Sequence, residues 1–184
     1  MCATHADVLL LALMASMSRN GRRPHPGRET AVEASQMIKV TSHAFADGQS
    51  IPARFTCDGD GQPPPLAWND VPAGTAALAL VVDDPDAPRG TFVHWVVLDL
   101  PGDATELDGS SLPSGVIQAT NSADRASYSP PCPPSGTHHY RFTVYALSAP
   151  TGLRDGAALD TALRAIESTA TAQGRLISTY SRSS

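Results

Sequence analysis

Three runs rich in apolar residues most strongly constrain how this 184-residue chain can fold. They lie at residues 76–82 (AALALVV), 92–100 (FVHWVVLDL) and 140–147 (YRFTVYAL). Short apolar runs bounded by Gly and Pro are typical of strands buried on both faces, because helices of a globular protein are usually longer. The sequence therefore predicts three central strands of one sheet.

Turn-forming residues separate these runs. The chain contains 14 Gly and 16 Pro, together more than the background of roughly 12%, and this excess favours many turns and short elements. Shorter strands are predicted at residues 66–68 (LAW) and 176–180 (LISTY). The predicted fold class is mainly β, an antiparallel β-sandwich with one C-terminal helix and short connecting helices or turns.

The predicted helix lies near residues 155–172. Leu159, Leu163 and Ile166 recur at the spacing that places side chains on one helical face. Gly174 is expected to end the helix, because glycine commonly follows the last helical residue.

Residues 1–36 differ from the rest of the chain. The apolar run at residues 8–17 has ten residues, whereas a membrane-spanning helix needs about 20. No Lys or Arg precedes this run and four Arg follow it, which is the reverse of a secretory signal. We therefore divide the chain into a disordered or processed N-terminal extension (residues 1–36) and one domain (residues 37–184).

Three interpretations of the extension stay open. The first is translation from an upstream start codon, with Met37 as the natural start. The second is a signal or anchor, and the third is a disordered functional tail. A cytoplasmic location is expected, with export as the alternative if residues 1–36 act as a signal.

Charge and cysteine content exclude several classes of protein. Residues 39–184 carry 9 basic and 15 acidic side chains with no basic run, so nucleic-acid binding is not expected. The sequence shows no basic amphipathic face, so stable membrane insertion is not expected. The three cysteines have neither zinc-type spacing nor the even number of a disulfide framework. A single bridge between Cys57 and Cys132 remains open.

Two polar motifs lie at or inside the predicted strands. The acidic stretch at residues 83–88 (DDPDAP) directly follows the first apolar run. It is either an acidic turn that keeps a sheet end soluble or a source of carboxylates that orient an imidazole. His94 lies within the second run, where alternation places it on one face with Val96 and Leu98, opposite Val93, Trp95 and Val97. It is either a core histidine bonded to a carbonyl or a site residue.

The third motif is the proline-rich stretch at residues 128–140 (YSPPCPPSGTHHY). Four prolines stiffen the backbone, and Gly136 permits a sharp turn into the next strand. His138 and Tyr140 are two residues apart and share a face of that strand. A rigid loop with these side chains suits a small anion site, although a proline-rich hairpin with a solvated histidine pair has the same pattern.

Together these motifs resemble the phosphatidylethanolamine-binding protein family, and within it the bacterial and archaeal Raf-kinase-inhibitor-like subgroup. The resemblance runs from about residue 38 to residue 182. It rests on CDG, PPLAW, DDPDAP, HW and YSPPCPPSGTHHY at residues 57–59, 64–68, 83–88, 94–95 and 128–140. Two departures from the family pattern are Pro130, where a glycine is usual, and the stretch NSAD at residues 121–124.

The resemblance implies a small pocket for phosphate or phosphoryl head groups. It further implies that aspartates orient the histidines, and that charged imidazoles and loop amides bind the anion; a homodimer is plausible on the same ground. Carried over to this chain, the ligand-binding residues are Asp84, Asp86, His94, Cys132, Pro134, His138 and Tyr140.

The expected function is that of a non-catalytic binding protein for a phosphorylated small molecule or head group, with modulation of a partner protein as an additional role. No cofactor and no resident metal ion are predicted. The alternative is a hydrolase, which would use either Cys132 as nucleophile with His138 as base or a metal held by His94, His138 and Asp84.

Overall fold

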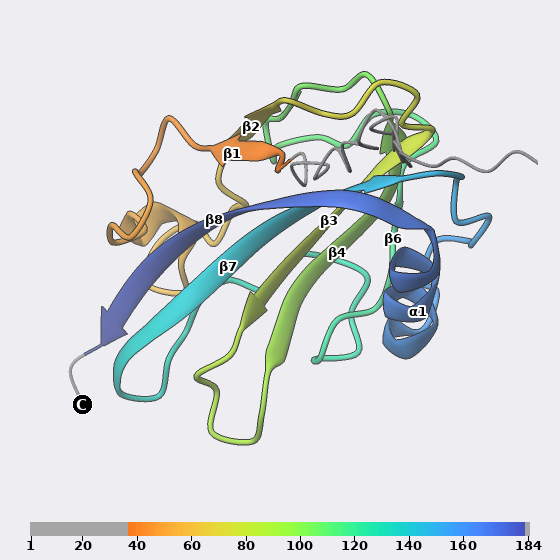
Figure 1. Ribbon diagram of the computed structural model, residues 1–184. Helices are drawn as coiled ribbons and strands as arrows, with labels where there is room; N and C mark the ends of the chain where they lie inside the picture. Colours follow the sequence, from red (N-terminus) through yellow and green to blue (C-terminus); the bar gives the residue numbers. More distant parts are fainter. Residues whose placement is uncertain (1–36, 183–184) are drawn as a thin grey trace, which may run out of the picture. The chain divides into compact units, whose positions relative to one another are not determined.

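The computed structural model describes residues 37–182, which form two antiparallel sheets and one α-helix (Figure 1). The smaller sheet has the order β1-β2-β5, and the larger has the order β6-β4-β3-β7-β8. The predicted mainly β fold class is confirmed. The strands are β1 (Lys39–Thr41), β2 (Leu66–Asn69), β3 (Ala77–Asp84), β4 (Phe92–Pro101), β5 (Glu106–Leu107), β6 (Ile117–Gln118), β7 (Gly136–Leu147) and β8 (Ala170–Arg182). A single 3-10 turn spans Ala53–Phe55.

The main hydrophobic core lies between the two sheets. Trp68 of the small sheet packs in the same cluster as Leu80, Val97 and Phe142 of the large sheet. Each is almost fully shielded from water, and burial of one such side chain contributes about 1.5–3 kcal/mol. The three apolar runs form β3, β4 and most of β7, as predicted, because strands in the middle of a covered sheet bury both faces.

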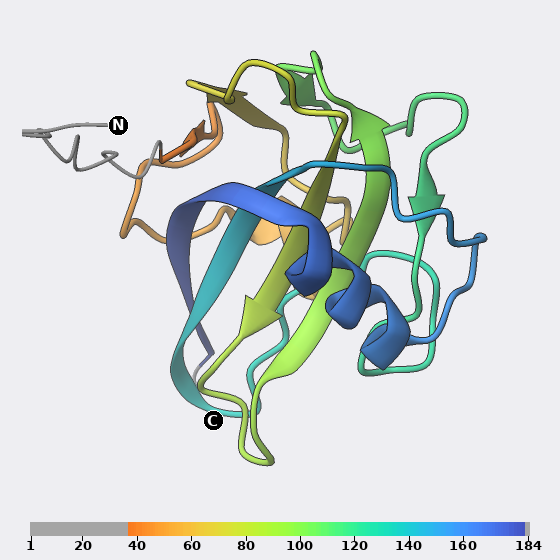
Figure 2. The same ribbon diagram turned by 45° about the vertical axis from the view of Figure 1, so that its right-hand side comes forward.

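The helix α1 (Leu159–Thr169) covers the other face of the five-stranded sheet (Figure 2). Ala162 and Ile166 are buried against that face, with Leu159 and Leu163 packed beside them. The helix is therefore confirmed with its predicted apolar face, but it is shorter than residues 155–172.

Gly174 does not end the helix, so that prediction is wrong. It lies inside β8, where the backbone of Ile38 crosses the strand and the Ile38 N–H donates to the Gln173 carbonyl oxygen at 3.3 Å. A Cβ on Gly174 would collide with the Ile38 carbonyl oxygen. Glycine here serves a close backbone approach, which is a usual reason for glycine within a strand.

A β-bulge places His94 on the opposite face from the predicted one. In the pairing of β3 with β4, Val82 faces Trp95 and Asp83 faces Val93, so His94 is the extra residue. Val93 therefore shares the helix-covered face with Val96. His94 instead packs against Tyr140 on the side of the main core. Bulges commonly re-aim a side chain next to a functional site.

Substituting Gly174→Ala should lower the free energy of unfolding by about 3 kcal/mol or more, because the added Cβ forces the Ile38 backbone away. Chemical denaturation of both proteins measures the loss. Gly74→Ala is the control: Gly74 has φ +83° and open space around it, so only the conformational cost of about 1 kcal/mol applies. Equal losses in the two variants would contradict the crossing of Ile38 over β8.

Candidate functional site

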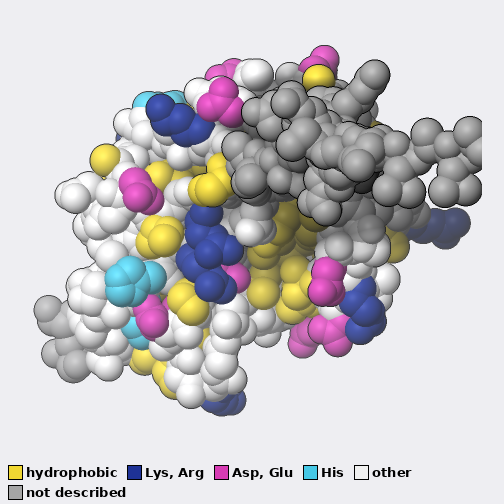
Figure 3. All heavy atoms as spheres, viewed as in Figure 1, with side chains coloured by type: hydrophobic (Ala, Val, Ile, Leu, Met, Phe, Trp, Pro, Cys, Tyr) yellow, Lys and Arg dark blue, Asp and Glu magenta, His cyan; other side chains and the backbone are white. Residues whose placement is uncertain are grey.

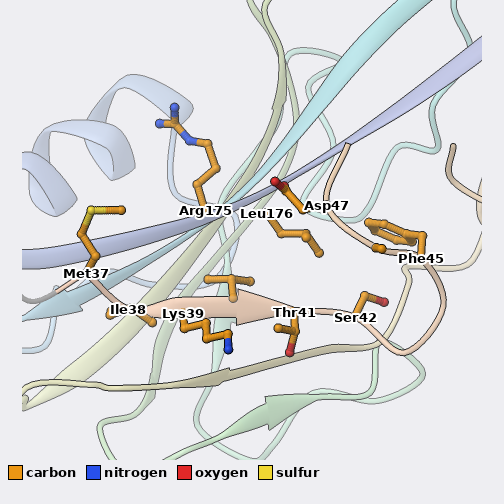
Figure 4. A pocket seen from close by; sticks show the side chains of 11 residues that line it. Met37, Ile38, Lys39, Thr41, Ser42, Phe45, Asp47, Arg175 and Leu176 are labelled. Atoms are coloured by element: carbon orange, nitrogen blue, oxygen red, sulfur yellow. The ribbon is translucent and has the colours of Figure 1, made fainter. Parts of the chain in front are cut away.

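Two cavities differ in the chemistry that they offer. The first, of about 520 Å³, lies between β1, the loop after it and β8 (Figure 4). Its lining is mostly apolar, as at Phe45 and Leu176, with charged groups such as Lys39 and Asp47. No unpartnered buried side-chain atom of residues 37–182 belongs to its lining.

The second cavity, of about 450 Å³, is lined by residues at the end of β3 and at the beginning of β4 and β7. Two buried polar atoms with no partner, His94 Nε2 and Tyr140 Oη, belong to residues that line it. Buried polar atoms are nearly always hydrogen-bonded, so these two mark the cavity as the candidate site. Six of the seven predicted residues line it: Asp84, His94, Cys132, Pro134, His138 and Tyr140.

Asp84 orients His138. The Asp84 Oδ2 atom accepts a 2.7 Å hydrogen bond from His138 Nδ1, and both side chains are buried. The other carboxylate oxygen accepts from the Asp86 N–H at 2.8 Å. Because β3 and β7 pair in register through Asp83 and Arg141, Asp84 and His138 point to the same side of the sheet. This arrangement leaves His138 Nε2 for the cavity.

Asp86 is not part of the cavity lining, unlike the other six predicted residues. Its Oδ2 atom accepts hydrogen bonds from the backbone N–H of His139 at 2.9 Å and from His139 Nδ1 at 2.7 Å. These bonds lower the pKa of Asp86. The side chains of His139 and Asp86 are 55% and 43% exposed, and histidine and acidic side chains meet on the surface seen in Figure 3. The strand alternation that turns His138 inward turns His139 outward, and Asp86 follows it.

The hydrogen bond of His94 fixes its tautomer. Nδ1 lies 2.7 Å from the Ser129 carbonyl oxygen, and since a carbonyl only accepts, Nδ1 carries the proton. Burial lowers the pKa of His94 below its ordinary value, and it outweighs the opposing effects of the bond to Ser129 and the nearby Asp84 carboxylate. In the neutral ring Nε2 is therefore a hydrogen-bond acceptor, and this buried atom has no partner within the described structure.

Tyr140 supplies a hydroxyl donor beside this ring. Its ring meets the His94 ring edge-on with centroids 5.3 Å apart, and Phe92 lies 4.8 Å from the His94 ring. Burial, followed by the Asp84 carboxylate, raises the pKa of Tyr140. Its hydroxyl thus stays protonated over the whole physiological range. The cavity combines aromatic walls with a few polar atoms, as small-molecule sites usually do.

Asn121 holds the loop that carries Ser129. Its Nδ2 atom donates to the His94 carbonyl oxygen at 3.1 Å and to the Ser127 carbonyl oxygen at 2.8 Å, and it lies 2.9 Å from the Ser129 hydroxyl. Its Oδ1 atom accepts from the Ala123 and Arg125 N–H groups, as in an Asx turn. Sequence reasoning treated residues 121–124 only as a departure from the family pattern and missed this role.

A disulfide joins Cys57 to Cys132 across 75 residues of sequence. It fastens the proline-rich loop to the segment before β2, where the Cys57 N–H also donates to the Pro131 carbonyl oxygen at 3.0 Å. Because the sulfur of Cys132 is bonded, the thiolate required by the cysteine-hydrolase alternative is absent. The prolines of this loop have no N–H groups, so the loop offers fewer backbone donors to a ligand.

A metal centre finds no support in the arrangement of ligands. Among residues 37–182, no three His, Cys, Asp or Glu side chains lie close enough together to hold a metal ion. Asp84, His94 and His138 therefore do not form the ligand set that the metal-hydrolase alternative needs.

Among residues 37–182, no helix has the length and apolarity needed to cross a membrane.

Comparisons with known proteins place these features in a family. Residues 41–181 match the family model described as phosphatidylethanolamine-binding protein. A UPF0098 protein of Methanothermobacter thermautotrophicus is 41% identical over 79% of this chain and 99% of its own length. The crystal structure of CT736, a Chlamydia trachomatis homologue of phosphatidylethanolamine-binding proteins, superposes with a TM-score of 0.75 at 34% identity and covers 80% of this chain and 99% of CT736.

One relative corrects the expected location. The Mycobacterium tuberculosis protein named "Putative lipoprotein LppC" is 46% identical over 82% of this chain and 76% of its own length. A lipoprotein is exported and anchored outside the cytoplasm, so the prediction of a cytoplasmic location is wrong. That prediction relied on residues 1–36, which lie outside the described part of the chain.

Under denaturing conditions without reductant, the full chain should show one free thiol, that of Cys2, and three after reduction. Quantification with a thiol-reactive dye measures both counts. Reduction should also lower the free energy of unfolding by roughly 4 kcal/mol, because it frees a loop of this length in the unfolded chain. Three reactive thiols before reduction would contradict the disulfide.

Proposed function

Since the chain belongs to the phosphatidylethanolamine-binding protein family, we propose that it is a non-catalytic binding protein whose cavity takes a phosphate or phosphoryl head group. The observation that carries this proposal is the pair of unpartnered buried atoms, His94 Nε2 and Tyr140 Oη. Buried polar atoms are nearly always hydrogen-bonded, so a polar ligand in this cavity would supply the partners that these two atoms lack within the described structure.

The charged groups of the lining support an anionic ligand such as a phosphoryl group. Arg89 is exposed on the loop after β3 and lines the cavity. The carboxylate of Asp84, which also lines the cavity, is already bonded to His138. A guanidinium in the lining suits phosphate oxygens. Phe92 and Pro133 provide apolar surface for the organic part of the ligand.

Phosphoethanolamine should bind the full chain in isothermal titration calorimetry. Tyr140→Phe removes the buried donor and should weaken binding about 5- to 10-fold. Arg89→Gln removes a charged partner and should weaken it about tenfold or more. Tyr145→Phe and Arg164→Gln, which change residues outside the cavity lining, are matched controls and should bind like the wild type.

The same titrations can also contradict the proposal of a phosphoryl site. If Tyr140→Phe and Arg89→Gln bind phosphoethanolamine as tightly as their controls, or the wild type does not bind it at pH 6.0, the cavity is not a phosphoryl site.

We also propose that the chain is exported. The "Putative lipoprotein LppC" relative supports this location, and so does the disulfide, because disulfides persist mainly in oxidising compartments. Alkaline phosphatase fused to the C-terminus of the full chain is active only outside the bacterial cytoplasm, so the fusion should be active. An inactive fusion that accumulates to the same level would contradict export.

A further inference from the structure

We infer that the cavity selects phosphate monoesters over phosphate diesters, because a buried nitrogen that faces the ligand can only accept a hydrogen bond. This inference rests on the proposed phosphoryl site and adds the class of ester that the site takes. It separates this chain's ligand from phosphatidylethanolamine itself, whose phosphate is a diester.

The ring of His94 cannot turn its proton toward the cavity. Its Nδ1–H is bonded to the Ser129 carbonyl oxygen, and the Ser129 N–H donates back to the His94 carbonyl oxygen at 2.9 Å. Asn121 holds the same loop, because its Nδ2 atom donates a hydrogen bond to the His94 carbonyl oxygen. Rotating the ring would break the Nδ1 bond and leave the Ser129 carbonyl without that donor. Nε2 therefore stays the atom presented to a ligand, and in the neutral ring it is an acceptor.

The other groups around His94 do not supply the missing proton. On β7, His138 directs its Nδ1–H to Asp84 of β3, so its Nε2 is also an acceptor while its ring is neutral. The Tyr140 hydroxyl makes no hydrogen bond to His94 within the described structure. Arg89 is exposed and lines the cavity, and Asp83, on the opposite face, is bonded to Arg141.

A monoester and a diester meet this arrangement differently. The monoanion of a monoester has one P–OH group, which donates to His94 Nε2, while its other oxygens accept from Tyr140 and Arg89. A diester has no P–OH group, so it either sets an oxygen lone pair against Nε2 or requires protonation of His94. Burial of the ring opposes that protonation. An unmatched buried acceptor of this kind corresponds to about tenfold or more in affinity.

The proton balance gives the inference a second signature. The second pKa of a phosphate monoester is about 6, so at pH 7.5 the free ligand is mostly the dianion. Binding as the monoanion then takes up close to one proton from the buffer, and that proton lies between the ligand oxygen and His94 Nε2. Affinity should fall about tenfold or more from pH 6.0 to pH 7.5. Attraction to the fixed charge of Arg89 alone predicts the opposite trend, because the dianion is the more charged species.

Calorimetry of the full chain with methyl phosphate and dimethyl phosphate tests the inference, since these ligands differ by one methyl group. The same titrations with phosphoethanolamine in buffers of different ionisation enthalpy count the protons. We expect the monoester to bind about tenfold or more tightly than the diester, with close to one proton taken up at pH 7.5. Equal affinities, or no proton uptake at pH 7.5, would overturn the inference.

The variant His94→Gln tests whether His94 Nε2 is responsible for the ester preference and the proton uptake. A glutamine amide can present an N–H donor without taking up a proton, so this variant should lose most of both the ester preference and the proton uptake. The exposed His43→Gln should retain both. Full retention by a folded His94→Gln variant overturns the inference, and if that variant does not fold, the wild-type ester comparison still decides.

The two proposals can fail separately. Phosphoethanolamine that binds without ester preference or proton uptake contradicts only the monoester inference. Absence of any phosphoethanolamine binding contradicts the phosphoryl site as well.

Discussion

The 2.7 Å hydrogen bond between His94 Nδ1 and the Ser129 carbonyl oxygen is the interaction on which the rest of the site depends. It exists because a β-bulge in β4 turns His94 toward the main core and because Asn121 holds Ser129 beside it. The disulfide at Cys132 then fastens the proline-rich end of the same loop. Bulge, loop and disulfide together fix a buried imidazole with one defined nitrogen toward the cavity.

Acidic and basic residues that are neighbours in the sequence lie on two different faces of the large sheet. Asp84 and His138 are buried and line the cavity. Asp86–His139 and Asp83–Arg141 lie on the opposite face and connect the acidic loop to β7. These two pairs hold the loop that carries Arg89, which lines the cavity, but they are not part of the cavity lining themselves. The acidic stretch at residues 83–88 thus contributes one carboxylate to the cavity lining and two that connect it to β7.

The main strands β3, β4 and β7 and the helix followed from the sequence, because hydrophobic patterning is a local property. Six of the seven predicted site residues line the cavity, and these came from the resemblance to the family rather than from strand alternation. The face of His94 did not follow from the sequence, since a bulge arises from the register with β3 and not from β4 alone. The partner of Asp86 depends on which way His139 points, and the place of Gly174 depends on Ile38, more than 130 residues away. The disulfide likewise required the distance between Cys57 and Cys132.

Long-range ¹H–¹⁵N NMR of the histidine rings tests the central claim most directly, because it reports the protonation of each ring nitrogen. In the full chain at pH 7.5, His94 should show a protonated Nδ1 and an unprotonated Nε2. Saturating phosphoethanolamine should shift Nε2 toward the value of a hydrogen-bonded nitrogen while Nδ1 stays protonated, and His138 should respond in the same titration. A folded chain in which neither ring responds would contradict the phosphoryl site.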